Sequence, residues 1–180
     1  MACRKRYIDE KLIEAVDEID AVVNLGAGFD TRVYRLPALA DLPAWEIDQP
    51  ENIAPKRLRL GKLFGAIPPH VNLVPIDFDR QDLGAALTAH GYSAAKRTFF
   101  IWEGVTQYLT HAGLVATFEF LAKAAPGSRL TFTHVRKDSL HGKAMHGDED
   151  VYKSFVVKGS GSSAWSQTAW NRSSIHSAGG

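Results

Sequence analysis

The sequence predicts a doubly wound α/β fold, in which a mainly parallel sheet carries helices on both faces. Short apolar runs alternate five times with segments of helical periodicity along the chain. The spacing leaves room for a helix between successive runs, as parallel strands require. Glycine- and proline-containing turns such as Gly91 and Pro126-Gly127 separate the segments. In such a fold the ligand crevice lies at the carboxyl ends of the strands.

The first helix and the first strand are predicted within the opening segment of the chain. Apolar residues recur at helical spacing between charged ones over residues 4–18, which predicts an amphipathic helix. Residues 19–25 form an apolar run that is too short for a core helix and is stopped by Gly26. We therefore expect a buried strand there.

The second and third strands are predicted over residues 44–48 and 71–76. Pro50 suits the first turn of the helix that follows the second strand, because that position needs no backbone N–H. After the third strand, Asp79 could cap a helix that ends at Gly91.

The fourth and fifth strands are predicted over residues 98–102 and 129–135, with a helix between them that Thr110 caps. Residues 158–180 are rich in Ser, Gly, Ala and Trp and show no periodicity. We interpret residues 1–157 as the folded domain and residues 158–180 as a poorly ordered tail.

Composition limits the functional classes. The chain has 180 residues, 45% of them hydrophobic, and a formal net charge of +1 without a clustered basic face, which argues against a nucleic-acid partner. Cys3 is the single cysteine and cannot form an internal disulfide or a cysteine-based zinc site. No apolar run approaches the roughly 18 residues of a membrane span, and no secretory signal is recognisable, so a cytoplasmic location is expected.

The strongest local signal is the run Asn-Leu-Gly-Ala-Gly-Phe-Asp-Thr-Arg over residues 24–32, where a predicted strand passes into a glycine turn and then a predicted helix. Gly26 permits the tight turn, and Gly28 lets backbone amides approach a ligand that a Cβ would hold away. Gly26, Ala27, Gly28 and Asp30 are therefore candidate cofactor-binding residues. Alternatively, the glycines serve only the strand-to-helix turn.

The dinucleotide fingerprint has a third glycine three residues after Gly28, but this chain has Thr31 there. Thr31 therefore counts against NAD or FAD. S-adenosyl-L-methionine (SAM) has no phosphate, and it needs the close backbone approach without that glycine. Its ribose diol calls for an acidic acceptor on the next strand, where the two oxygens of Asp48 could accept from both hydroxyls.

Asp48 also has a structural interpretation, because Asp48 and Glu51 form a capping-box pattern, and the two roles can coexist. Asparagine caps about as well as aspartate but cannot present two acceptors to a diol. Asp48→Asn is then expected to leave the melting temperature within about a degree and to weaken cofactor binding by about 1.5–3 kcal/mol.

Further carboxylates follow the third and fourth strands. Asp77 and Phe78 are placed to meet an adenine amino group and ring, although a solvated turn is equally compatible with them. Glu103 follows the fourth strand, where the crevice should open. The histidines and acidic residues between positions 134 and 150 match no metal-binding spacing, so no metal site is predicted. No catalytic residue is identified.

Taken together, these residues resemble the leucine carboxyl methyltransferase-like family, in its bacterial branch of SAM-dependent methyltransferases. The segments that carry the resemblance occur in the family's order and at its approximate spacing within residues 4–157. They are residues 4–9, 25–32, 45–50, 77–78 and 102–109. The resemblance implies a Rossmann-like methyltransferase fold with SAM as cofactor.

By this resemblance, Gly26 would lie against the methionine part of SAM and Asp48 would bind the ribose. Asp77 and Phe78 would hold the adenine, and Arg4 would pair with the cofactor carboxylate.

Glu103 matches a residue that lines the family's cofactor pocket. The implied reaction is in-line displacement by a substrate nucleophile on the sulfonium methyl group, accelerated mainly by positioning, without a metal. The acceptor would be a nucleophile of a small molecule or of a protein terminus; it is a protein C-terminal carboxylate in the family's namesake.

The sequence departs from the family after Val157, where two further strands and a substrate-covering segment are expected. One hypothesis is that the reading frame is truncated or shifted near Lys158, which sequencing of the locus in a near relative would test. Three interpretations therefore stand: a SAM-dependent methyltransferase, a truncated SAM-binding protein without catalysis, and a nicotinamide-dependent oxidoreductase. Thr31 counts against the third.

Overall fold

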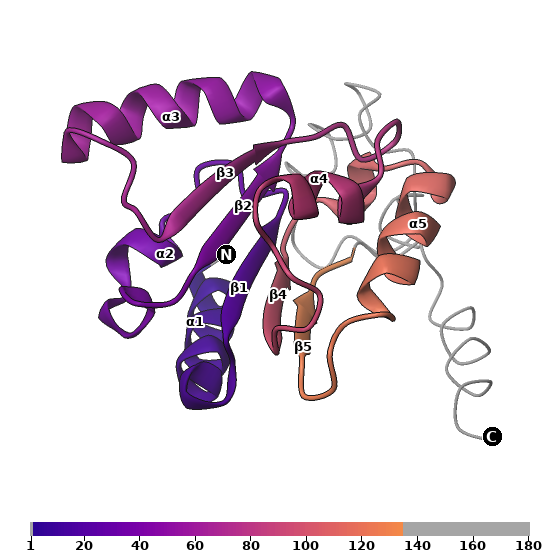
Figure 1. Cartoon of the computed structure of the whole chain (residues 1–180), viewed down its shortest axis with the longest axis horizontal. Helices are drawn as coiled ribbons and strands as arrows, with labels where there is room; N and C mark the ends of the chain where they lie inside the picture. Colours follow the sequence, from indigo (N-terminus) through magenta and orange to yellow (C-terminus); the bar gives the residue numbers. More distant parts are fainter. Residues whose placement is uncertain (1, 135–180) are drawn as a thin grey trace.

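A five-stranded parallel sheet forms the centre of the computed structural model, which describes residues 2–134 (Figure 1). The strands are β1 (Ala21–Leu25), β2 (Ala44–Asp48), β3 (Val71–Pro75), β4 (Thr98–Trp102) and β5 (Arg129–Phe132). Their order in the sheet is β3-β2-β1-β4-β5, and each neighbouring pair is parallel. The predicted fold class and all five predicted strands are confirmed, although β5 ends before the predicted position.

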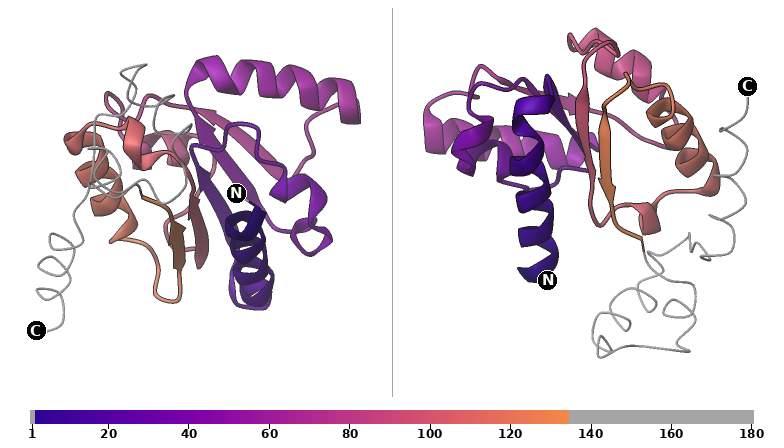
Figure 2. Two further views of the ribbon diagram at one scale, coloured as in Figure 1. Left: turned by 180° about the vertical axis from the view of Figure 1, so that it is seen from behind. Right: turned by 90° about the horizontal axis from the view of Figure 1, so that it is seen from below.

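Helices cover both faces of the sheet, which gives the three-layered arrangement visible from below in Figure 2. One face carries α1 (Ala2–Ala15), α2 (Arg32–Arg35) and α3 (Pro50–Phe64), and the other carries α4 (Leu83–Ala89) and α5 (His111–Leu121). Short 3-10 turns lie at η1 (Val16–Glu18), η2 (Pro37–Leu39) and η3 (Thr106–Tyr108). Neighbouring residues of a strand face opposite layers: Val22 packs with α1, and Val23 packs with α4 and α5.

Helix α1 matches the predicted amphipathic segment, which η1 extends to Glu18. Its apolar stripe is fully covered, since Ile8 and Leu12 are 1% and 0% exposed. Burying each such side chain stabilises the docked helix by about 1.5–3 kcal/mol. Arg4 lies one turn before Ile8, and this packing brings it to the carboxyl end of β4, where it contacts Glu103.

Two helix caps were predicted on this half of the molecule, and one prediction is wrong. Thr110 does cap α5, because its hydroxyl accepts a hydrogen bond from the Gly113 N–H. Helix α4 is capped by Asp82, which accepts from the Ala85 N–H, and not by Asp79. Asp79 is occupied elsewhere: its carboxylate accepts from both the backbone and the hydroxyl of Thr110.

Within residues 2–134, β5 pairs with β4 alone and is partly exposed, whereas β1 and β4 are fully buried. The predicted domain boundary at residue 157 and the tail over residues 158–180 lie outside the described residues. No helix in the described part of the chain is long and apolar enough to cross a membrane.

Candidate functional site

A pocket of about 440 Å³ opens at the carboxyl ends of the strands, where the chain order reverses between β1 and β4. This switch point is the expected ligand site of a doubly wound sheet. Four of the nine predicted site residues line it, namely Gly26, Asp48, Phe78 and Glu103. The other lining residues are Gln49, Asn52, Gly104, Val105, Tyr108 and Leu109.

The glycine turn is fixed to the end of β2 and leaves no room for a larger residue at its start. The N–H groups of Gly26 and Ala27 both donate to the Ile47 carbonyl, at 2.8 and 2.9 Å. Gly26 has φ +70°, and a Cβ there would lie 2.1 Å from Cγ2 of Val105. Glycine is therefore required at position 26 both by backbone conformation and by the approach of Val105.

Asp48 joins the glycine turn to the start of α3. Its Oδ2 accepts from the Gly28 N–H at 2.6 Å, and its Oδ1 accepts from the Gln49 N–H and from Nδ2 of Asn52, both at 2.7 Å. A carboxylate offers about four lone-pair positions. These three bonds therefore leave one position, on Oδ2, open toward a ligand.

The predicted capping box at Asp48 and Glu51 is wrong. The N-cap of α3 is Gln49, which makes no side-chain cap hydrogen bond, while Asp48 still belongs to β2. The local sequence pattern did not indicate the true role of the Asp48 carboxylate, which accepts from the Gly28 amide. Gly28 is distant from Asp48 in sequence.

Glu103 lies at the pocket edge and binds two arginines. Its Oε1 accepts from Nε of Arg4 at 2.6 Å, and its Oε2 lies 2.8 Å from Nη2 of Arg32. The side chain of Glu103 is 10% exposed, whereas that of Arg4 is 42% exposed. Arg4 does not itself line the pocket, but it stands beside it through this ion pair.

Asp30 does not line the pocket and serves the turn instead. Its carboxylate forms an ion pair with the buried Arg32 and accepts from Nδ2 of Asn24 at 3.0 Å. Arg32 also donates to Asp9 of α1 at 2.7 Å. Partial burial would raise the pKa of Asp9, but hydrogen bonds from Arg35 and Arg32 outweigh it and lower that pKa. Through its contacts with Asp9, Asp30 and Glu103, Arg32 therefore links α1, the glycine turn and the pocket.

Asp77 likewise does not line the pocket, although the adjacent Phe78 does and is 7% exposed. The Asp77 carboxylate accepts from the Asp79 N–H at 3.0 Å, and Nε of Arg80 lies 3.5 Å from it. Both contacts lie within the turn that follows β3. Ala27 and Gly28 also stay outside the lining, and their amides hold the turn in place.

A second buried ion pair supports the turn from the layer of α3. Nζ of Lys56 lies 2.8 Å from Oε1 of Glu46 and donates to the Asp30 carbonyl at 3.1 Å. Tyr34 donates its hydroxyl to the other oxygen of Glu46. Burial raises the pKa of Glu46, while the adjacent Lys56 opposes that rise.

Sequence reasoning missed several residues of the pocket wall. Asn52 follows Asp48 by four residues, so the predicted helix start could have indicated that their side chains meet. Val105, Tyr108 and Leu109 lie in a segment that carried the resemblance, but no local pattern shows that this segment folds over Gly26.

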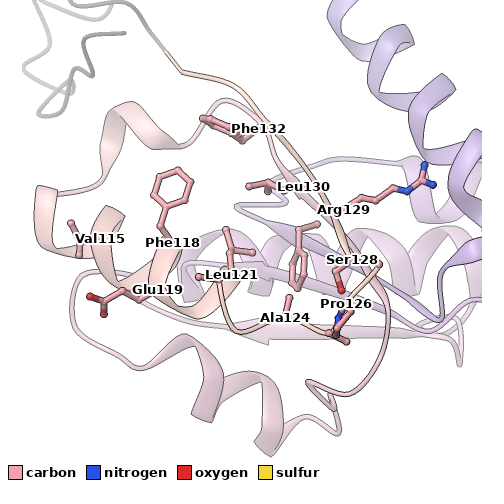
Figure 3. A pocket seen from close by; sticks show the side chains of 14 residues that line it. Val115, Phe118, Glu119, Leu121, Ala124, Pro126, Ser128, Arg129, Leu130 and Phe132 are labelled. Atoms are coloured by element: carbon pink, nitrogen blue, oxygen red, sulfur yellow. The ribbon is translucent and has the colours of Figure 1, made fainter. Parts of the chain in front are cut away.

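A larger cavity, of about 750 Å³, lies between α5 and β5. Figure 3 shows Phe118 and Leu121 of α5 beside Leu130 and Phe132 of β5 around this space. Its lining is mainly apolar and lacks the convergent polar groups that fix a ligand's orientation. The smaller pocket is therefore the better candidate. Within residues 2–134, no three His, Cys, Asp or Glu side chains gather as metal ligands.

Comparisons with known proteins identify the family of the chain. A family model described as leucine carboxyl methyltransferase matches residues 1–122. A protein of Mycolicibacterium gilvum named "Putative S-adenosyl-L-methionine-dependent methyltransferase" is 39% identical over 138 residues, which are 75% of this chain and 44% of that protein. A Streptomyces coelicolor protein with the same description is 38% identical over 133 residues, covering 72% of this chain and 43% of that protein. The chain thus spans less than half the length of these curated relatives.

Solved structures show the same fold at low sequence identity. A methyltransferase structure from Thermobifida fusca, titled as putative, has a TM-score of 0.63 at 16% identity and covers 91% of this chain and 60% of that chain. A glycopeptide N-methyltransferase complexed with sinefungin has a TM-score of 0.51 at 13% identity, covering 74% and 55% of the two chains. These likenesses establish a Rossmann-like fold for the described sheet and helices.

Proposed function

Because the chain belongs to the leucine carboxyl methyltransferase family, we propose that the pocket at Gly26, Asp48, Phe78 and Glu103 binds SAM for methyl transfer. The observation that carries this proposal is the convergence of these residues at the strand ends, although they come from four separate segments of the chain. The proposed acceptor is a nucleophile of a small molecule or of a protein terminus.

The charges around the pocket fit the amino-acid part of SAM. Glu103 carries the negative charge that an ammonium group needs, and Arg4 beside it carries the positive charge that a carboxylate needs. Arg32 holds the other oxygen of Glu103 from the buried side. The ion pair between Arg4 and Glu103 would open as each side chain takes its own partner from the ligand.

The opposite end of the pocket fits a nucleoside. The open position on Oδ2 of Asp48 can accept from one ribose hydroxyl, and Asn52 can turn from Oδ1 to the other. Phe78 supplies an apolar surface for the base. Asp77 would accept from the adenine amino group once its carboxylate leaves the Asp79 amide.

When bound, SAM supplies an electrophilic methyl group on a positively charged sulfur. The residues of this chain contribute binding and orientation, because the glycine turn, Asp48 and Glu103 fix the two ends of the ligand. Holding reacting groups in line removes much of the entropic part of the barrier.

The proposal is tested by thermal unfolding and calorimetry of the 180-residue chain with SAM, S-adenosylhomocysteine and NAD. Ligand at about 100 times its dissociation constant stabilises the folded state by about 2.7 kcal/mol, which raises the melting temperature by several degrees. We expect this rise with SAM and S-adenosylhomocysteine and none with NAD. The absence of heat and of a shift with both sulfur nucleosides would contradict the proposal.

Catalysis is tested separately, with methyl-labelled SAM and fractions of a cell extract, by mass-spectrometric detection of methylated products. A labelled product supports the methyltransferase. Binding of SAM without transfer to any fraction would restrict the function of the chain to SAM binding.

A further inference from the structure

One short segment forms half of the pocket wall. Of the ten lining residues, five belong to residues 103–109, which we call the pocket-wall loop. Those five are Glu103, Gly104, Val105, Tyr108 and Leu109. The position of this loop therefore decides the width of the pocket and the place of the Glu103 carboxylate.

Thr133, which follows β5, holds the beginning of the pocket-wall loop. Its Oγ1 accepts a hydrogen bond from the Gly104 N–H at 2.8 Å, and its carbonyl accepts from the hydroxyl of Thr106 at 2.9 Å. Its own N–H donates to the Trp102 carbonyl at 3.0 Å, which continues the pairing of β4 with β5. Thr133 does not line the pocket.

These bonds fix a turn that only glycine adopts easily. Gly104 has φ +73°, and its carbonyl accepts from Nε2 of the buried Gln107 at 2.9 Å. Because both backbone groups of Gly104 are bonded, the next residue, Val105, has a fixed direction. Val105 is the side chain that closes over Gly26.

The geometry points to Thr133 as a positioning residue of the cofactor pocket, which acts through Gly104 and Val105 on the glycine turn. Its hydroxyl holds the pocket-wall loop at the distance that ligand binding needs. The nature of the ligand rests on the proposed function, but the link from Thr133 to the loop does not.

The test compares Thr133→Val, which removes the hydroxyl and keeps the side-chain shape, with Thr133→Ser, which restores it. Thr131→Val is the matched control, because Thr131 lies two residues earlier in β5 and its hydroxyl makes no hydrogen bond within residues 2–134. Two quantities are measured: hydrogen exchange of the Gly104 amide in the free protein, and the dissociation constant for S-adenosylhomocysteine by calorimetry.

In Thr133→Val we expect the Gly104 amide to exchange about tenfold faster and the dissociation constant to rise about five- to tenfold, the change that loss of one hydrogen bond gives. Thr133→Ser and Thr131→Val should both stay within about twofold of the parent, since neither loses that bond. Unchanged exchange at Gly104 in Thr133→Val would overturn the inference. Faster exchange with unchanged affinity would also overturn it, because Thr133 would then stabilise the loop without positioning the pocket.

If the parent chain gives no heat with S-adenosylhomocysteine while Gly104 exchange still responds to Thr133→Val, the proposed function fails and the link between Thr133 and the loop stands. Should Thr133→Val not fold, Thr106→Val removes the bond from the Thr106 hydroxyl to the Thr133 carbonyl and leaves Thr133 in place. We then expect the same faster hydrogen exchange of the Gly104 amide and the same higher dissociation constant for S-adenosylhomocysteine. Parent-like results for both measurements would overturn the inference.

Discussion

The Asp48 carboxylate both holds the backbone and faces the pocket. Three hydrogen bonds, from Gly28, Gln49 and Asn52, fix its two oxygens, so its orientation is set before any ligand arrives. Such preorganisation lowers the cost of binding, because the side chain loses little further freedom. The same bonds make Asp48 part of the fold, which changes what its substitution should do.

Asp48→Asn should weaken cofactor binding and also lower stability, contrary to the unchanged melting temperature expected from the sequence. An asparagine that keeps its oxygen toward Gln49 and Asn52 turns its NH2 group toward the Gly28 N–H, and the unpaired amide costs about 1–3 kcal/mol. Separately, we expect the binding free energy of S-adenosylhomocysteine to become about 1.5–3 kcal/mol less favourable. Chemical denaturation and calorimetry measure the two effects, with the exposed Asp41→Asn as control. Parent-like stability would show that the bond to Gly28 contributes nothing.

Individual residues of the site could be predicted from the sequence where they lie at the carboxyl end of a strand. Gly26, Asp48 and Glu103 each lie at or directly after the end of a predicted strand, and parallel strands bring such ends together. Asp30 and Asp77 also lie beyond strand ends, but their carboxylates bind other residues of the protein and do not line the pocket. Which partner a carboxylate takes depends on tertiary contacts such as the buried Arg32, and these leave no periodic signal.

At the scale of elements, α3 is joined to β2 by a buried ion pair between Lys56 and Glu46. Lys56 and Glu46 are 3% and 0% exposed, and Tyr34 completes the group. Removing one partner of a buried pair leaves an uncompensated charge, whereas removing both can be nearly neutral.

Lys56→Met should therefore lower the free energy of unfolding at pH 7 by about 3–5 kcal/mol. The double substitution Lys56→Met with Glu46→Gln should recover part of this loss, because no buried carboxylate then lacks its partner. Urea denaturation measures both, and Lys62→Met on the exposed side of α3 serves as control. A double variant less stable than the single one would disprove the compensation.

The starts of β1 and β4 are joined by a surface ion pair. Arg97 donates to Asp20 from its backbone and its guanidinium, and these hydrogen bonds lower the pKa of Asp20 to about 2. The unfolded-state pKa is about 3.9, so the pair stabilises the fold above that pH, and its contribution disappears as the pH falls from about 4 through 2.

Asp20→Asn should consequently flatten the dependence of unfolding free energy on pH between about 4 and 2, the interval between the two pKa values. Denaturation curves of parent and variant at half-unit pH steps give the two slopes, and Asp41→Asn controls for loss of an acidic group. Equal slopes for the parent and Asp20→Asn would mean that the ion pair is not formed in solution.

Elements were predictable to the extent that local periodicity and turn residues define them. The apolar runs of the sequence that form β1 to β4 are short and bounded by turns. Each of these strands lies within two residues of its predicted bounds. The start of α4 was missed because Asp79 and Asp82 are equally good caps locally. Tertiary contacts decide between them. Asp79 accepts from the hydroxyl of Thr110, the N-cap of α5, and Asp82 is left to cap α4.

At the scale of the whole molecule, the sheet has a protected centre and weaker edges. Strand β1 has a partner on each side, and its five residues are buried between the helix layers. Within the described residues, β3 and β5 each have one neighbour, and β5 is the more exposed of the two. Sequence patterns predicted parallel strands but did not place β1 at the centre, because strand order depends on which helices fill the two faces.

This arrangement predicts a gradient of local stability across the sheet. Amides of β1 should exchange hydrogen only through global unfolding, which typically costs about 5–15 kcal/mol, because opening β1 requires both neighbours to separate. Amides of β5 should exchange by local opening at lower cost, since one row of hydrogen bonds and little buried surface hold that strand. Native-state hydrogen exchange followed by NMR, with denaturant added below the unfolding transition, separates the two cases. Exchange in β5 as slow as in β1, with the same denaturant dependence, would contradict the gradient and show that β5 opens only when the entire sheet does.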